Sequence, residues 1–229
     1  MQLTIREAAR MVNLSERALY EAVRKGELPA PEVGGQRRVN RTELLEFVTR
    51  RNLRVSADIL GVADADEGPL PALSDALEAG GVFHGLPGTD KPTVLRALVD
   101  KMPLPPEIEP EFLCNILLAR EALGSTALGD GIAIPHVRNP IVLRVARPAI
   151  TLGFLQTPIE FGALDARPVH ALFSLISPTT RIHLHLLARL AYALRDERFK
   201  AAVVCQARRE EILMAARRIE TTAQPPPGP

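Results

Sequence analysis

The chain of 229 residues has few cysteines, no long apolar run and almost no net charge. Cys114 and Cys205 are the only cysteines, and neither has a partner at CxxC or CxxH spacing, so we expect structural free thiols. No stretch approaches the roughly 18 continuous apolar residues that a membrane span needs. The first ten residues, MQLTIREAAR, lack the basic start and apolar run of a signal peptide. We therefore expect no membrane association and a cytoplasmic location.

The net charge of +1 hides an uneven distribution. Residues 1–54 hold 11 Lys and Arg against 7 Asp and Glu, whereas the remainder holds 17 against 20. A basic patch on a small domain is the electrostatic footprint of a polyanion binder. Hydrophobic residues make up 46% and charged residues 24%, which is typical of a globular protein, and the length suits a small domain plus a medium one.

Periodicity divides the chain into four segments. Residues 1–51 contain short helical patterns with a turn-rich insert, and residues 52–72 lose periodicity and are predicted to be a linker. In residues 73–219, apolar runs such as AITLGFL and VHALFSLIS alternate with amphipathic patterns such as FLCNILLAREAL and HLHLLARLAYAL. Interleaved strands and helices predict an α/β domain. The last segment, 220–229, ends in AQPPPGP and is predicted to be a disordered tail.

The N-terminal segment carries the start and stop signals of two short helices. Thr4 followed by Glu7 forms a capping box for the first helix, which turns Ala8, Ala9 and Val12 inward. A turn at Asn13 and Leu14 separates it from a second helix that begins after Ser15, buries Leu19 and Val23, and stops at Gly26.

A hairpin and a closing helix complete this segment. Gly34 and Gly35 predict a tight turn between EV and RRV, which gives a short basic wing. Thr42 is predicted to open a final helix whose apolar side packs on the first two helices. The apolar side consists of Leu44, Leu45 and Val48.

Residues 2–50, taken together, resemble the excisionase and MerR-type winged helix-turn-helix family. The resemblance implies that the helix at 15–25 enters the DNA major groove and that the wing meets the backbone. A single copy is expected to bind weakly, so a homodimer or a tandem site is predicted. The alternative is a protein-binding module whose arginines are merely solvated. The candidate DNA-binding residues are Arg17, Tyr20 and Arg24 on the helix and Arg37 and Arg38 on the wing.

His136 follows a short apolar strand, IAI, and Pro135, in the motif LGDGIAIPH. Proline fixes the exit from the strand, and the preceding glycines let backbone amides approach a ligand. A histidine at a strand end is expected to be partly exposed and oriented. Its neutral imidazole can attack phosphorus when the other ring nitrogen is held by a hydrogen bond. Just upstream, REALGST supplies Arg120, Ser125 and Thr126 as candidate donors to the phosphoryl oxygens.

The run LAREALGSTALGDGIAIPH resembles the fructose and mannitol class of phosphotransferase-system IIA domains, including its nitrogen-regulatory branch. The resemblance spans about residues 73–215. It implies a mixed sheet flanked by helices and phosphorylation of His136 by a histidine-containing phosphocarrier protein, with Arg120 lining the same site. The second histidine of the family matches His183, which shares a helix face with Leu187, Leu190 and Leu194, whereas His185 lies on the opposite side.

One position departs from the family pattern. The residue after the active histidine is commonly small and is Val137 here, which predicts a narrower approach for the phosphoryl donor. His84 and His170 are interpreted as satisfied strand histidines. No metal site is expected from His183 and His185, because two residues two positions apart on a helix diverge by roughly 200°. No cofactor is expected either.

Three functions fit these patterns. The first is a DNA-binding regulator whose IIA domain is phosphorylated on His136, which makes the chain a phosphohistidine carrier rather than a free-standing enzyme. The second is a phosphocarrier whose helix-turn-helix is non-regulatory or binds protein. The third is a binding module with an inactive IIA domain. Retention of His136, Arg120 and His183 together favours the first two. The chain contains no transporter membrane domain and no IIB-type cysteine motif, so sugar transport within the chain is excluded.

Overall fold

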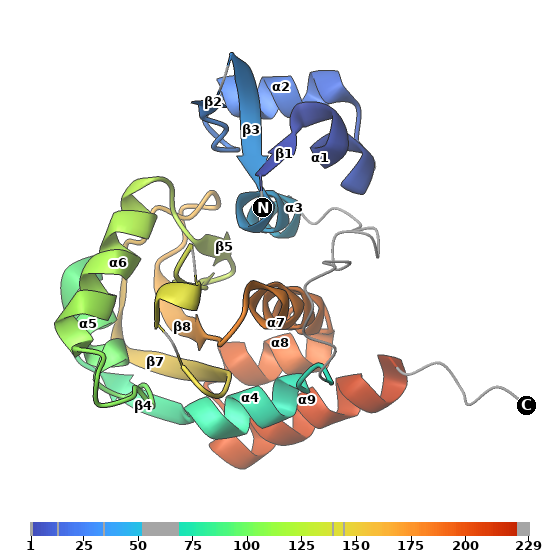
Figure 1. Cartoon of the computed structure of the whole chain (residues 1–229). Coiled ribbons are helices and arrows are strands. Elements are labelled where there is room, and N and C mark those ends of the chain that lie inside the picture. The colour runs from blue at the N-terminus through green and yellow to red at the C-terminus, as the bar shows by residue number, and fades with distance from the viewer. Residues whose placement is uncertain are drawn as a thin grey trace, which may run out of the picture. The chain divides into compact units, whose positions relative to one another are not determined.

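The computed structural model describes residues 2–12, 14–33, 35–51, 69–138, 140–143 and 145–223. The chain divides into two compact units, Met1–Glu67 and Gly68–Pro229 (Figure 1). The predicted turn residues Asn13 and Gly34 and most of the predicted linker lie outside the described residues.

The smaller unit follows the predicted order of helix, helix, hairpin and helix. Its helices are α1 (Ile5–Met11), α2 (Glu16–Arg24) and α3 (Arg41–Arg50). Its strands are β1 (Gln2–Thr4), β2 (Glu32–Val33) and β3 (Gln36–Asn40), which lie in the order β1-β3-β2. The sequence did not reveal β1, whose pairing with β3 adds a third strand to the wing.

The predicted helix caps of this unit are present in the structure. Thr4 accepts a hydrogen bond from the amide of Glu7, whose side chain bonds back to Thr4, so the predicted capping box is confirmed. Ser15 caps α2, and Gly26 has a φ of 74°, a left-handed conformation that glycine adopts at low cost. Leu19 is buried as predicted, but Val23 is only half-buried, and α3 begins at Arg41 rather than at Thr42.

The larger unit is a mixed five-stranded sheet in the order β4-β7-β8-β6-β5, which confirms the predicted α/β class. Only β7–β8 and β5–β6 run antiparallel, whereas β4–β7 and β6–β8 run parallel. The strands are β4 (Val82–Leu86), β5 (Ala127–Gly129), β6 (Ile132–Ala133), β7 (Ala149–Ile159) and β8 (Val169–Ile176).

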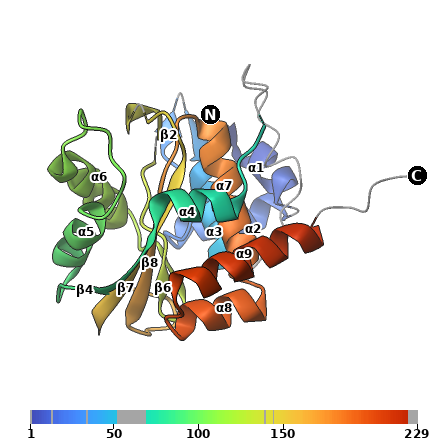
Figure 2. The same ribbon diagram turned by 90° about the horizontal axis from the view of Figure 1, so that it is seen from below.

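Helices cover both faces of this sheet. In Figure 2, α5 and α6 lie on one side of the strands, and α4, α7, α8 and α9 lie on the other. Strands covered on both faces are apolar along nearly their whole length, as β7 and β8 are. The helices are α4 (Leu73–Gly80), α5 (Lys91–Val99), α6 (Pro110–Ala122), α7 (Thr180–Ala193), α8 (Glu197–Val204) and α9 (Arg209–Ala223), with a short 3-10 helix η2 (Pro140–Leu143).

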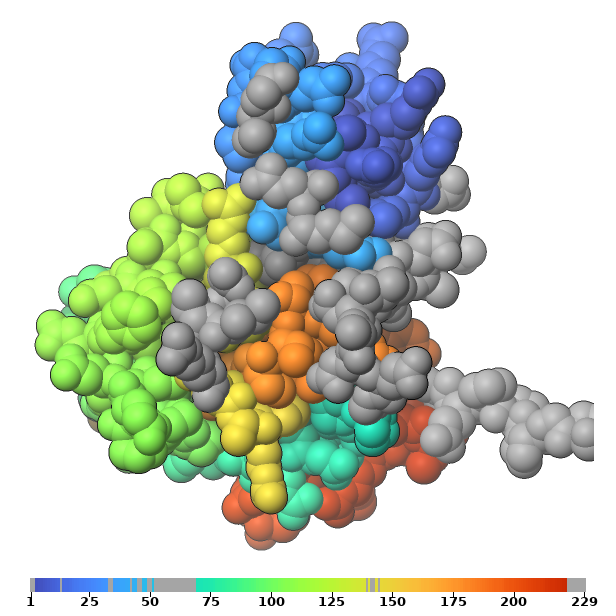
Figure 3. All heavy atoms as spheres, viewed as in Figure 1, coloured from blue at the N-terminus to red at the C-terminus, as the bar shows by residue number. Residues whose placement is uncertain are grey.

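The side chains of α5 and α6 form a continuous surface over one flank of the unit, shown in green in Figure 3. Beneath them lies a core built around the fully buried Phe161 and residues of β7 and β8. No helix among the described residues is long and apolar enough to cross a membrane.

The C-terminal helix extends beyond the predicted domain end. α9 continues through Ala223, so residues 220–223 are helical rather than part of the predicted tail. Glu220 accepts hydrogen bonds from the amides of Leu73 and Ser74, and its other oxygen lies 2.6 Å from the Ser74 hydroxyl. Because Ala72 supplies no side-chain cap, this distant carboxylate satisfies the start of α4.

Candidate functional site

His136 lies three residues after the end of β6, beside β8, where it forms a parallel bridge with Leu175. Its Nδ1 lies 2.7 Å from the carbonyl oxygen of Ile134. A carbonyl only accepts hydrogen bonds, so Nδ1 carries the proton and donates it. In the neutral ring, Nε2 then holds the lone pair.

The His136 ring is buried, with 1% of the residue exposed, so the expectation of partial exposure was wrong. The residue does not project from a strand end, because the bridge to Leu175 keeps it within the sheet. Its ring also packs against that of His183, with 5.5 Å between the ring centroids.

His183 lies in the first turns of α7, after the N-cap Thr179. It shares the buried face with Leu187, Leu190 and Leu194, as helical spacing predicted. Burial, and secondarily repulsion from His136, lowers its pKa from 6.5 to about 3. Among the described residues, neither ring nitrogen of His183 has a hydrogen-bond partner. A neutral imidazole with an N–H to offer therefore lies beside His136.

The upstream motif is placed next to His136 by backbone pairing. The carbonyl of Thr126 accepts the N–H of Ile134 at 3.1 Å, and β5 pairs with β6. Arg120 lies in the last turn of α6 and donates from Nη1 to the carbonyl of Gly124 at 3.0 Å, which holds the turn between helix and strand.

In the structure, the hydroxyls of Ser125 and Thr126, two of the candidate donors to the phosphoryl oxygens, make hydrogen bonds within the fold. The Ser125 hydroxyl donates to the carbonyl of Phe161 at 2.6 Å, and the Thr126 hydroxyl donates to Glu121 at 2.7 Å. Each hydroxyl has a single proton, so both are used within the fold. Phe161 lies on a distant part of the chain, which is why REALGST alone did not reveal this arrangement.

The glycines before β6 allow close packing. Gly131 has a φ of 75°, and a Cβ there would lie 2.2 Å from Nδ1 of His170. His170 is half-buried, its pKa is lowered by burial, and its Nε2 has no partner among the described residues, so it is not the satisfied histidine expected. His84, in contrast, contacts the carbonyls of Gln206 and Ala207 at 3.0 and 3.2 Å.

Val137, the residue that departs from the family pattern, lies in the core of the larger unit. Its side chain is fully buried in the hydrophobic core. Its side chain is therefore directed into the core. His185 is half-buried and bonds to the carbonyl of Pro71 at 3.1 Å.

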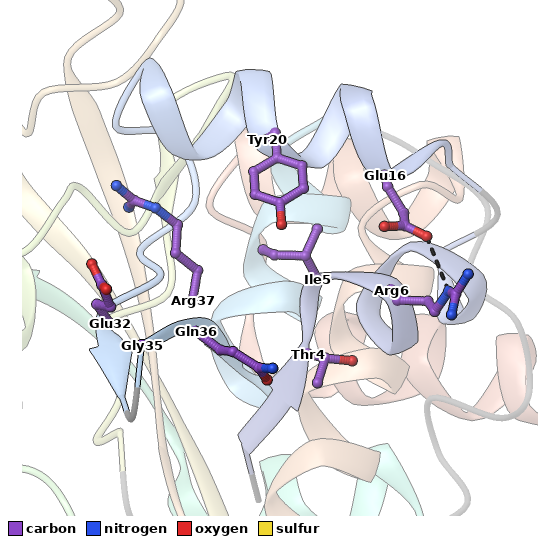
Figure 4. A pocket seen from close by; sticks show the side chains of 9 residues that line it. All are labelled: Thr4, Ile5, Arg6, Glu16, Tyr20, Glu32, Gly35, Gln36 and Arg37. Carbon is purple, nitrogen blue, oxygen red and sulfur yellow. Dashed lines mark hydrogen bonds and ion pairs between the residues drawn. The ribbon is translucent and has the colours of Figure 1, made fainter.

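In the smaller unit, α2 and the wing border one cavity of about 490 Å³. Tyr20 from α2 and Arg37 from β3 both line it, together with Gln36 (Figure 4). Arg6, on α1, also lines it and pairs with Glu16 at 3.2 Å. The sequence did not single out Arg6, because nothing in its local pattern distinguishes it from a solvated helix residue.

The other candidates of this unit lie outside the cavity lining. Arg17 is 89% exposed along its side chain and pairs with Glu21 at 3.4 Å, which is an exposed pair of little energetic value. Arg24 is exposed, and Arg38 is half-buried with its guanidinium 3.3 Å from Gln36 Oε1.

Comparison with known proteins identifies both units. The family model "Phosphoenolpyruvate-dependent sugar phosphotransferase system, EIIA 2" matches residues 76–217. The chain belongs to this EIIA type 2 family. A second model, "Helix-turn-helix domain", matches residues 3–52, so the smaller unit carries that domain.

The relatives of the EIIA domain include nitrogen regulatory proteins. The chain is 37% identical to the one from Pseudomonas aeruginosa over 122 residues, which cover 52% of this chain and 77% of the relative. It is 40% identical to the one from Escherichia coli over 92 residues, 39% of this chain and 55% of that protein. The match therefore spans about half of the Escherichia coli protein.

Solved structures agree on the fold. The crystal structure of Nitrogen Regulatory Protein IIA-Ntr from Neisseria meningitidis superposes with a TM-score of 0.51 at 27% identity, covering 64% of this chain and 95% of that one. A IIA protein from Streptococcus mutans, at 21% identity and a TM-score of 0.52, covers 67% of this chain and 97% of its own and shares the fold.

Proposed function

We propose that His136 accepts a phosphoryl group from a histidine-containing phosphocarrier protein, in the cytoplasm. The observation that carries this proposal is the hydrogen bond from Nδ1 to the Ile134 carbonyl, which fixes the tautomer whose lone pair lies on Nε2, the nitrogen that attacks phosphorus. The bond from Nε2 to phosphorus forms as the bond from phosphorus to the donor nitrogen breaks, and that electron pair returns to the donor ring. The positive charge that develops on His136 is stabilised by the same carbonyl.

The neighbouring groups then stabilise the phosphoryl oxygens. His183 is neutral at physiological pH before transfer and donates an N–H to one oxygen, since its nitrogens have no partner among the described residues. Arg120 supplies positive charge during transfer. The chain acts as a carrier, because the phosphoryl group must pass on to another protein.

Incubation with phosphoenolpyruvate, enzyme I and a histidine-phosphocarrier tests this site. We expect one acid-labile phosphoryl group, detected by intact mass spectrometry, and none in His136→Ala. His185→Ala is the matched control, because that histidine lies on the same helix as His183 but bonds to Pro71. Labelling that persists in His136→Ala would remove the proposal.

We further propose that the helix-turn-helix domain binds DNA and that phosphorylation alters its occupancy of that DNA. Support comes from the excess positive charge of the first 54 residues and from the cavity that Tyr20 and Arg37 share. The contacting residues proposed are Arg17, Tyr20, Arg24, Arg37 and Arg38. A homodimer or tandem sites supply the affinity that one copy lacks.

DNA affinity, measured at two salt concentrations, tests the second proposal. Each phosphate contact contributes about one unit to the slope of log affinity against log salt concentration. We therefore expect Arg37→Ala to weaken binding and to reduce this slope by about 1. Phosphorylation adds nearly two negative charges and should weaken binding at low salt relative to His136→Ala. Equal affinities for the phosphorylated protein and His136→Ala favour the alternative, a phosphocarrier with a non-regulatory helix-turn-helix.

A further inference from the structure

A continuous series of polar contacts runs from α5 to the active-site histidine. Lys91, at the start of α5, has its Nζ 3.0 Å from Oε1 of Glu121. The side chain of Glu121 is only 4% exposed, although it is charged. Its second oxygen, Oε2, accepts from both the amide and the hydroxyl of Thr126, at 3.0 and 2.7 Å. One carboxylate therefore joins the lysine to both donors of Thr126.

The series continues through the backbone to the imidazole. The carbonyl of Thr126 accepts the N–H of Ile134 at 3.1 Å. The carbonyl of Ile134 in turn accepts the Nδ1 proton of His136 at 2.7 Å. Because β5 and β6 also pair at Ala127 and Ala133, a displacement of Thr126 moves the segment that carries the Ile134 carbonyl.

Both ends of the ion pair are themselves held in place. The Lys91 Nζ lies 4.9 Å from the centre of the Phe161 ring, a cation–π distance. The carbonyl of Phe161 accepts the hydroxyl of Ser125 at 2.6 Å. Residues 125 and 126 are thus fixed from two sides, by Phe161 and by Glu121.

The energetics favour a positioning role for this pair. Burying a carboxylate is costly unless it is paired and hydrogen-bonded, and a buried ion pair contributes little net stability compared with apolar side chains of the same volume. What Lys91 and Glu121 provide is a fixed geometry for Thr126 that apolar residues do not supply.

We propose that Lys91 and Glu121 are positioning residues for phosphoryl transfer: their ion pair fixes Thr126, Thr126 fixes Ile134, and the Ile134 carbonyl holds His136 with Nε2 unprotonated. The inference rests on His136 being the phosphoryl acceptor. Neither residue contacts the reacting atoms. Their effect is on the orientation and the tautomer of the nucleophile, which set the rate at which it attacks.

The test uses the full chain in the variants Glu121→Gln and Lys91→Met. Two quantities are measured: the initial rate of phosphorylation by the phosphocarrier, and the imidazole 15N shifts of unphosphorylated His136. We expect the rate to fall about 10-fold, the lower end of what outer partners of metal-bound histidines contribute. The 15N shifts should move towards a mixture of the two tautomers. Lys91→Arg keeps the cation and should preserve both quantities.

Two exposed residues give matched controls, Glu107→Gln and Lys101→Met, which should leave both quantities unchanged. A loss of thermal stability with an unchanged rate and unchanged 15N shifts would assign a structural role only and overturn the proposal. If Glu121→Gln fails to fold, the rates and 15N shifts of Lys91→Met and Lys91→Arg still test the proposal. If wild-type protein takes up no phosphoryl group, the proposed function fails, and the 15N shifts still test the positioning role.

Discussion

Phosphorylation of His136 should raise the pKa of His183 strongly. In the unphosphorylated protein, repulsion between the two rings adds to burial in lowering the pKa of His183 to about 3. A phosphoryl group reverses the sign of that electrostatic contribution, because it brings negative charge to the neighbouring ring.

The size of the effect follows from the spacing of the rings. With the 5.5 Å between the ring centroids as the separation of the charges, one unit charge contributes about 3 kcal/mol at an effective permittivity of about 20. This energy raises the pKa of His183 by about 2 for each unit of negative charge. Two charges therefore bring its titration close to physiological pH.

An NMR titration of the histidine side chains, with and without phosphorylation, measures this change. Unphosphorylated His183 should stay neutral down to pH 5, whereas the phosphorylated protein should show His183 taking up a proton above that pH. His185 on the same helix serves as the internal control, because its ring bonds to the Pro71 carbonyl. An unchanged titration of His183 would show that the phosphoryl group does not face this ring, and would refute the reasoning.

Three further perturbations test the site and the fold. Arg120→Lys keeps the charge but loses the planar guanidinium, so the transfer rate should fall, and an unchanged rate and phosphorylated-state lifetime would contradict the assignment. Folding lowers the pKa of His183, so its contribution to the free energy of unfolding is complete above pH 6.5. This contribution is lost by about 1.4 kcal/mol per pH unit as the pH falls towards 3. We therefore expect the free energy of unfolding, measured with urea, to fall by about 2 kcal/mol less between pH 7 and pH 5 in His183→Gln than in wild type. Glu220→Ala should lower the free energy of unfolding by about 1–2 kcal/mol, because it removes the cap of α4, and Glu210→Ala is the exposed control.

Local signals in the sequence predicted local structure well. The caps at Thr4 and Ser15 and the stop at Gly26 depend on residues a few positions apart, and the structure confirms them. The face of α7 that carries His183 could equally be predicted from the sequence, because helical spacing alone decides which residues share it.

The contacts that the sequence did not reveal join residues far apart in the chain. The Ser125 hydroxyl donates to the carbonyl of Phe161, and the His170 ring packs so closely on Gly131 that a Cβ there would clash with it. A local motif reveals neither contact. Glu220 was predicted to belong to the tail because the residues that follow it are rich in proline. In the structure, its carboxylate accepts a hydrogen bond from Ser74. Arg6 gave no signal, since only the fold brings it to the cavity beside Tyr20.

The burial of Val137 limits how freely the active-site motif can be exchanged between relatives. A grafted loop that carries the motif with a small residue after the histidine would remove a side chain from the centre of this core. Core truncations of this kind leave a cavity and cost about 2–4 kcal/mol. The residue that follows the acceptor histidine must therefore be chosen together with the apolar residues behind it, and an engineered chimera would have to transplant both.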